Sequence, residues 1–238
     1  LTFYGDMDVS RLIEKPTNRK RIITLSKPEE KISEVLSFLK KQISLGNQIF
    51  WVCPLIEESK NFDYAAAVKK YDFLNSQFLE KVGLIHGNLT KDKKEIVLKK
   101  FLNKSIDILV STTVIEVGID FPNANVIVIE NSNKFGLSQL HQLRGRVGRG
   151  QFPGICILMT DEFDSSEAHQ RLDIMCRSSD GFKIAEKDLE IRGPGEFLGT
   201  RQSGLPDFWF AHIVRDQKLL ALSRKEAKEF LKIRGETR

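Results

Sequence analysis

Apolar and polar positions follow two alternating patterns between Ile22 and Thr160. Short, near-continuous apolar runs predict buried strands at Ile22–Leu25, Gln48–Pro54, Val82–Gly87, Asp107–Ser111, Asn125–Glu130 and Ile155–Thr160. The segments between them have the apolar spacing of amphipathic helices and predict helices at Lys27–Leu45, Tyr64–Leu79, Thr90–Lys104 and Ser138–Arg146, with the Thr90 side chain as an N-terminal cap. Apolar strands that alternate with amphipathic helices are typical of the α/β class, with a parallel sheet covered by helices on both faces.

After Thr160 the pattern predicts helices and no strands. The expected helices are Ser165–Arg177, Asp180–Ile191 and Gln217–Leu231, with an irregular glycine-rich run from Arg192 to Gly204. The polar, proline-led stretch Pro16–Arg21 is typical of a linker. We therefore expect three parts: residues 1–20 as the end of a preceding domain and a linker, 21–161 as the sheet domain, and 162–238 as a helical extension. Because the chain begins at Leu1 in the middle of a pattern, we expect a piece of a longer protein.

Composition restricts the class of protein but does not indicate a function. The 238 residues are 41% hydrophobic and 29% charged, as in soluble globular proteins. The balance of 37 Lys plus Arg against 32 Asp plus Glu, a net charge of +5, points only weakly to a polyanionic partner. The three cysteines lack metal-ligand spacing and indicate free thiols in a reducing compartment. No apolar run approaches the ~20 residues that span a bilayer, so we expect no membrane contact and a cytoplasmic location.

The stretch Gln142–Gly150 is the strongest candidate for chemistry. It holds three arginines and three glycines in nine residues. Arginine offers a planar fork of donors that matches phosphate oxygens, and glycine lets the backbone approach a ligand closely. Arg146 and Arg149 are three residues apart, so on a helix they would point the same way, toward the terminal phosphate of a nucleotide. The alternative is a basic loop that happens to be rich in glycine.

Polar groups also follow two of the predicted strands. Thr112 and Thr113 offer hydroxyls for a phosphodiester, and Asp120 could bond a ribose hydroxyl, although an ordinary turn would contain the same residues. His86 and Gly87 could present backbone donors to nucleic acid, against the alternative of a structural histidine. Since ligands of parallel sheets bind beyond the carboxyl ends of the strands, we expect these groups and the arginine-rich stretch to share one edge of the sheet.

Three other patterns have simpler interpretations or an open role. A solvated face explains the lysines between Lys91 and Lys104 better than a phosphate track does. Met159–Asp164 imitates a magnesium-binding acidic box, but the chain contains no G-x-x-x-x-G-K-[ST] loop and no Gly-Lys pair, so we interpret these acids as a loop that enters a helix. Asp188–Gly204 indicates a shaped loop that contacts something or couples two moving parts.

Together these residues resemble the second motor domain of superfamily 2 helicases. Gln142, Gly145, Arg146 and Arg149 match motif VI, Gln-x-x-Gly-Arg-x-x-Arg, and Thr112–Asp120 matches motif V. The strand ending at Pro54 lies where motif IV does, and Asp188–Gly204 resembles the translocation motif shared by RecG-type and Mfd-type proteins. The sequence Arg-Gly-Pro-Gly-Glu, which begins at Arg192, favours the RecG type. The alternatives are an Mfd-type transcription-repair translocase lobe and a nucleic-acid-binding module without ATPase activity.

The resemblance implies a RecA-like lobe of an ATP-dependent DNA helicase that remodels branched DNA at stalled forks and recombination junctions. In that family ATP binds between two lobes, and the first lobe supplies the phosphate loop and the Mg²⁺ ligands. The implied partners are branched or duplex DNA and, in the same chain, an N-terminal wedge and a first motor domain. The implied setting is the bacterial cytoplasm, at the nucleoid, in DNA repair and recombination. The piece alone is expected to be inactive.

The resemblance also assigns roles to individual residues, and it assigns no metal ligand to this chain. The implied catalytic residues, which reach or sense the γ-phosphate, are Arg146, Arg149 and Gln142. The implied nucleotide-binding residues are Gly118, Asp120 and Gly145. The implied DNA-binding residues are His86, Gly87, Thr112 and Thr113. The implied residues of a helical hairpin that turns lobe closure into movement on duplex DNA are Arg171, Arg192 and Gln202.

Overall fold

The computed structural model describes most of the chain between residues 21 and 197. The described residues are 21–54, 60–112, 121–150, 152–161 and 166–197, with positions 219, 222, 223, 225–227 and 229–231. Residues Thr17–Asp188 form one compact unit, and Leu189–Arg238 belong to a second. In the second unit the structure describes the end of one helix and helical conformation at those positions after 218. No helix among the described residues is long and apolar enough to cross a membrane.

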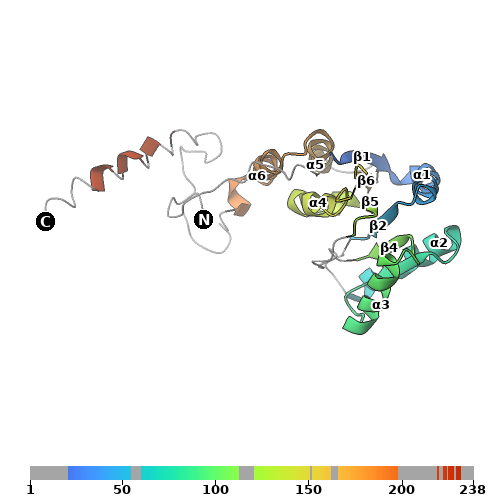
Figure 1. Ribbon diagram of the computed structural model, residues 1–238. Coiled ribbons are helices and arrows are strands. Elements are labelled where there is room, and N and C mark those ends of the chain that lie inside the picture. The colour runs from blue at the N-terminus through green and yellow to red at the C-terminus, as the bar shows by residue number, and fades with distance from the viewer. Residues whose placement is uncertain are drawn as a thin grey trace. The chain divides into compact units, whose positions relative to one another are not determined.

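The centre of the first unit is a six-stranded sheet in which every adjacent pair of strands is parallel (Figure 1). Its strands are β1 (Ile23–Pro28), β2 (Gln48–Val52), β3 (Val82–Ile85), β4 (Ile108–Ser111), β5 (Ala124–Ile129) and β6 (Ile155–Thr160). Their order across the sheet is β1-β6-β5-β2-β4-β3. Every residue of β2, β4 and β5 is buried, which is why these strands are apolar almost throughout rather than alternating. The predicted parallel sheet is confirmed.

Helices connect successive strands, and two more follow the last strand. They are η2 (Glu29–Lys31), α1 (Ile32–Ser44), α2 (Lys60–Gln77), α3 (Lys91–Leu102), η3 (Ser132–Lys134), α4 (Leu137–Arg144), α5 (Ser166–Arg177) and α6 (Gly181–Phe197). The first predicted helix begins later than expected because Lys27 and Pro28 complete β1. Thr90 does occupy the N-cap position of α3, but its side chain makes no capping hydrogen bond.

The glycine-rich run after Ile191 corrects one expectation. The sequence predicts irregular structure from Arg192, whereas α6 continues to Phe197 and includes Gly193, Pro194 and Gly195. Glycine costs a helix interior about 1 kcal/mol and proline about 3 kcal/mol, which is a weak local preference that the surrounding structure can override.

Both faces of the sheet are covered, as predicted. On one face α1 and α2 contribute Val35, Leu39 and Leu74 to a core that includes Ile49 and Trp51 of β2. Phe50, between those two strand residues, points to the opposite face, because successive side chains of a strand alternate. There it meets Phe101 of α3 and Phe121, with ring centroids 5.3 and 5.7 Å away. Arg144 of α4 reaches Thr24 of β1 on this second face.

Buried amides fix the amino ends of the central strands. The Gln48 side chain at the start of β2 donates to the carbonyl oxygens of Phe101 (2.5 Å) and Ile106 (2.9 Å). Asn125 of β5 donates to the Asn47 side chain at 2.8 Å. Because a buried polar group without a partner costs about 1–3 kcal/mol, these pairings favour one register for the amino edge of the sheet.

Candidate functional site

The predicted DNA-binding residues that the structure describes lie together at the carboxyl edge of the sheet. β3 and β4 are neighbours, and Ile85 is opposite Ser111 at their carboxyl ends. His86 and Gly87 continue directly from β3, and Thr112 continues from β4, where its backbone N–H donates to the Ile85 carbonyl at 3.4 Å. The expectation that these three positions share an edge is confirmed. Thr113, Gly118 and Asp120 lie outside the described residues.

Each of these positions has a distinct environment. Gly87 is exposed, and a Cβ added there would meet nothing within 4 Å, so its backbone is accessible. His86 is half-buried, and burial, followed by the charge of Lys94, lowers the pKa of its imidazole. The Lys94 ammonium in turn donates to the Gly87 carbonyl at 3.5 Å. Thr112 is buried, only 4% exposed, so its side chain supports the edge rather than extending from it.

The arginine-rich stretch lies at the opposite, amino edge of the sheet, which corrects the prediction of a single shared edge. An added Cβ at Gly148 would lie 2.9 Å from the backbone nitrogen of Gly154, just before β6. At Gly150 it would collide with the carbonyl oxygen of Pro122, just before β5. The prediction failed because α4 carries the chain back along the sheet after β5, so whatever follows this helix is at the end where strands begin.

The predicted helix through Arg146 is also shorter than expected. α4 ends at Arg144 with Gly145 as its C-cap, so Arg146 and Arg149 lie on the turn that follows rather than on one helical face. Gly148 has φ of +71°, a left-handed conformation that favours glycine and turns the chain between the two arginines. The Arg149 guanidinium folds back, and its Nε and Nη2 both donate to the Gly145 carbonyl at 3.3 Å.

The members of motif VI therefore differ in exposure. Gln142 and Arg149 are exposed, and Arg146 is half-buried. Val147 between the arginines is fully buried and anchors the turn to the protein interior. Residues Gly145–Gly150 consequently form a turn, called the arginine turn below. It holds the exposed guanidinium of Arg149 and the half-buried one of Arg146 at the amino edge, next to the starts of β5 and β6.

Arg144 is a feature that the sequence did not single out. It is only 4% exposed, and its Nη1 donates to the carbonyl oxygens of Met175 (2.7 Å) and Ser178 (2.8 Å) at the end of α5. Its Nη2 is 2.9 Å from Nδ1 of His141, one turn earlier on α4. These partners are uncharged, and burial lowers the pKa of the guanidinium. In the sequence Arg144 looks like its neighbours Arg146 and Arg149, so no pattern separates the buried arginine from the accessible ones.

The implied hairpin residues are described only in part. Arg171 lies in α5, and its Nε is buried without a hydrogen-bond acceptor among the described residues. The backbone of Arg192 belongs to α6, and its side chain is outside the described part of the structure. Gln202 lies outside it altogether.

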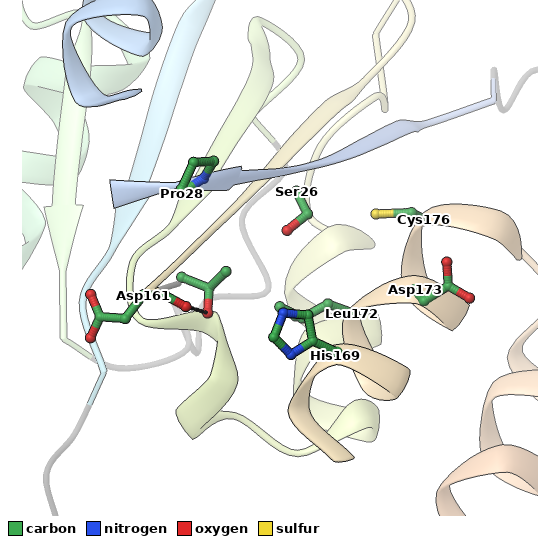
Figure 2. A pocket seen from close by; sticks show the side chains of 8 residues that line it. Ser26, Pro28, Asp161, His169, Leu172, Asp173 and Cys176 are labelled. Carbon is green, nitrogen blue, oxygen red and sulfur yellow. Dashed lines mark hydrogen bonds between the residues drawn. The ribbon is translucent and has the colours of Figure 1, made fainter. Parts of the chain in front are cut away.

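The structure also contains an open pocket that the sequence did not predict, at the carboxyl ends of β1 and β6. Its volume is about 560 Å³, and it is lined by Ser26, Pro28, Thr160, Asp161, His169, Leu172, Asp173 and Cys176. Figure 2 shows His169, Leu172, Asp173 and Cys176 of α5 on one side, with Ser26 and Pro28 of β1 on the other. No group of three or more His, Cys, Asp or Glu side chains that could hold a metal ion occurs among the described residues.

Family models match the chain in two segments. The helicase conserved C-terminal domain matches residues 29–151, and domain 3, C-terminal, of the ATP-dependent DNA helicase RecG matches residues 178–237. The first segment contains both edges described above, and the second contains α6.

Curated relatives of the same type are similar along nearly the whole chain. The ATP-dependent DNA helicase RecG of Bacillus subtilis is 46% identical over 95% of this chain, which spans 33% of that protein. The RecG of Thermotoga maritima is 48% identical over 96% of this chain, which spans 30% of that protein. The RecG of Synechocystis is 47% identical over 97% of this chain, which spans 28% of that protein. The chain therefore spans about a third of the length of these relatives.

Solved structures agree on the fold. A structure of RecG bound to a three-way DNA junction matches 87% of this chain and 26% of its own, with a TM-score of 0.68 and 46% identity. Domain 2 of the DEAD-box helicase Mss116p, bound to an RNA duplex, matches 72% of this chain and 69% of its own, with a TM-score of 0.50 and 20% identity. The latter similarity concerns the RecA-like fold alone.

Proposed function

Since the chain belongs to the helicase conserved C-terminal domain family and is of the RecG type, we propose that it is the second motor lobe of an ATP-dependent helicase that remodels branched DNA. In this account Arg146 and Arg149 act on ATP held between this lobe and a first lobe that supplies the phosphate loop. The carboxyl edge of the sheet contacts the DNA backbone. The helices after β6 convert lobe closure into movement along duplex DNA.

The observation that carries the proposal is the rigid turn at the amino edge. Gly148 and Gly150 press against Gly154 and Pro122, so the backbone that holds Arg146 and Arg149 cannot shift without disturbing the starts of β5 and β6. Such fixed positioning favours a guanidinium that must meet a phosphoryl group at one place, because a positioned arginine needs no reorganisation when charge develops. A surface arginine that only adds positive charge would not need it.

The second nucleotide element is consistent with this location. Asp120 directly precedes Phe121 and Pro122 in the sequence, and Pro122 is the residue that Gly150 touches. Phe121, the first described residue after that segment, adjoins Pro122 and so lies next to the turn that carries Arg146 and Arg149. This supports a shared nucleotide site formed by Gly118, Asp120, Gly145 and Gln142 with the two arginines.

The resting contact of Arg149 gives the site a simple means of responding to ATP. Its guanidinium bonds the Gly145 carbonyl through two long hydrogen bonds of 3.3 Å. Charge-assisted bonds to phosphate are shorter and stronger than bonds to a neutral carbonyl. A γ-phosphate presented by a closing lobe would therefore draw the fork away from Gly145, and hydrolysis would be tied to closure.

Hydrogen-bond donors at the carboxyl edge support DNA contact there. The exposed backbone at Gly87 and the nearby Lys94 ammonium offer a donor-rich surface, and phosphate oxygens are the acceptors that such surfaces position. The nucleotide and DNA sites are then at opposite edges of one sheet. Under the proposal, a change at the nucleotide edge must therefore be transmitted through the lobe to the DNA edge.

The test uses the full-length helicase that contains this chain, with DNA-stimulated ATP hydrolysis measured on a forked substrate. Arg149→Ala should lower turnover by ~10³–10⁵-fold while DNA binding is retained, as expected for loss of an arginine finger. The matched control is Arg177→Ala, since Arg177 is an exposed arginine on α5 that pairs only with Asp173 at 2.8 Å in the described structure. Unchanged turnover in Arg149→Ala would show that the Gln142–Gly150 stretch is not the catalytic element, and would favour a nucleic-acid-binding role for this lobe.

A further inference from the structure

The connection between α5 and α6 rests on a single turn of α4. Arg144 bonds the carbonyl oxygens of Met175 and Ser178, where α5 ends. His141, three residues earlier, lies under the first residue of α6, because a Cβ added to Gly181 would be 3.1 Å from its Nε2. Residues three apart on a helix share a face, so one face of α4 holds both the end of α5 and the start of α6.

The two side chains also fix each other. Arginine can only donate hydrogen bonds, so the 2.9 Å contact between Arg144 Nη2 and His141 Nδ1 requires that nitrogen to be an acceptor. The imidazole is therefore neutral in this contact, with its proton on Nε2. A neutral ring can lie beside a buried guanidinium, whereas a charged ring there would repel it.

The charge of Arg144 suits the place it occupies. The last carbonyl groups of a helix are unpaired within it and carry the negative end of the helix dipole. A buried cation at the end of α5 therefore meets partial negative charge. One nitrogen of its planar fork, Nη1, bonds both carbonyl oxygens while the other, Nη2, contacts His141, and the single ammonium of a lysine cannot occupy both positions.

The position of this pair along the chain suggests its role. α4 ends at Arg144, Gly145 is the cap, and Arg146 follows immediately. Because the turn is rigid, a force applied to Arg146 or Arg149 on ATP binding or release would reach α4 within two residues of Arg146 rather than being absorbed in the turn. Arg144 and His141 would pass it to the α5–α6 connection, and so to the helix that carries Arg192.

On these grounds, and resting on the proposed function, we propose that Arg144 and His141 are positioning residues that form the mechanical joint between the nucleotide site and the helices after β6. Neither residue touches ATP or DNA in this account. Their role is to make the α5–α6 connection follow the end of α4, so that each hydrolysis event moves the protein along duplex DNA.

The experiment measures two quantities in the full-length helicase: DNA-stimulated ATP turnover, and base pairs translocated per ATP by displacement of a third strand. Arg144→Lys keeps the charge but loses the fork. It should leave turnover and the KM for DNA within about threefold and lower the base pairs moved per ATP by at least about tenfold, the size of a typical coupling. Arg177→Lys, an exposed arginine at the same end of α5, should change neither quantity.

A second variant protects the test against a folding defect. Gly181→Ala leaves Arg144 in place but presses a methyl group against the His141 ring, and it should uncouple in the same way. Equal losses of turnover and translocation, with a lower melting temperature, in both variants would show a merely structural role and overturn the proposal. Wild-type coupling in both variants would overturn it as well. Failure of the proposed function looks different, because then Arg149→Ala would keep full turnover.

Discussion

Gly148 sets the path of the backbone between Arg146 and Arg149. Its φ of +71° costs an L-amino acid about 1–2 kcal/mol, and the backbone of Gly154 leaves no room for a side chain. The turn is therefore fixed both by a conformation and by a close contact. A glycine at this place serves the arginines on either side of it without contacting a ligand.

Comparison with Gly46 separates those two causes. Gly46 has a similar φ of +84° but nothing within 4 Å of its added Cβ. Gly46→Ala should therefore lower the free energy of unfolding by about 1–2 kcal/mol, the strain alone. Gly148→Ala should lower it clearly further, because backbone atoms must also move apart. Urea unfolding of the two variants measures the difference, and equal losses would contradict a tight turn.

At the scale of elements, an aromatic cluster holds α3 and the start of the β5 segment to the sheet. Phe101 of α3 lies 5.3 Å from both Phe50 of β2 and Phe121, measured between ring centroids. Phe121 begins the described chain directly after the motif V segment that ends with Asp120. The cluster therefore fixes Phe121, and with it the start of the chain that leads into β5.

Removal of the central ring should loosen this point. Phe101 is fully buried, so Phe101→Ala should lower the free energy of unfolding by about 3–5 kcal/mol, measured by urea denaturation. The adjacent Leu102 is 39% exposed and is the matched control, and Leu102→Ala should cost clearly less. If the two variants unfolded at the same urea concentration, the ring cluster would not be the element that secures α3.

The elements themselves could be predicted from sequence because burial leaves a direct pattern. Apart from Gln48 and Asn125, β2 and β5 are apolar since both of their faces are covered, and α1 places Val35, Leu36 and Leu39 on one side. The edge at which a loop lies could not be predicted from spacing alone. The stretch after Gln142 was expected beside His86, and only the path of α4 shows that it lies at the other end of the strands.

The sequence also could not predict which individual polar residues are buried. Arg144, Arg146 and Arg149 are the same residue type with the same charge. Arg144 is nevertheless buried against the end of α5, whereas Arg149 is exposed. The pocket beside Cys176 was missed for a related reason, because its walls come from β1, β6 and α5, which are far apart in sequence. Such convergence depends on tertiary packing and leaves no local period.

At the scale of the whole molecule, the length of the strands separates two groups of predicted site residues. The arginine turn is at the amino edge, and His86, Gly87 and Thr112 are at the carboxyl edge. α4 runs between them and contacts the α5–α6 connection through Arg144. The sequence contains no phosphate-binding loop, so in this account the lobe supplies arginines and movement but not the cradle for ATP.

The claim that Arg149 stabilises the transition state of ATP hydrolysis is tested most directly by binding rather than by rate. Full-length helicase and its Arg149→Ala variant would be titrated with ADP alone and with ADP plus aluminium fluoride, which mimics the transferring phosphoryl group. The wild type should bind the mimic at least ~100-fold more tightly than ADP, as transition-state analogues are bound. Arg149→Ala should lose most of that difference while its affinity for ADP is unchanged. A variant that keeps the full difference would contradict the central claim.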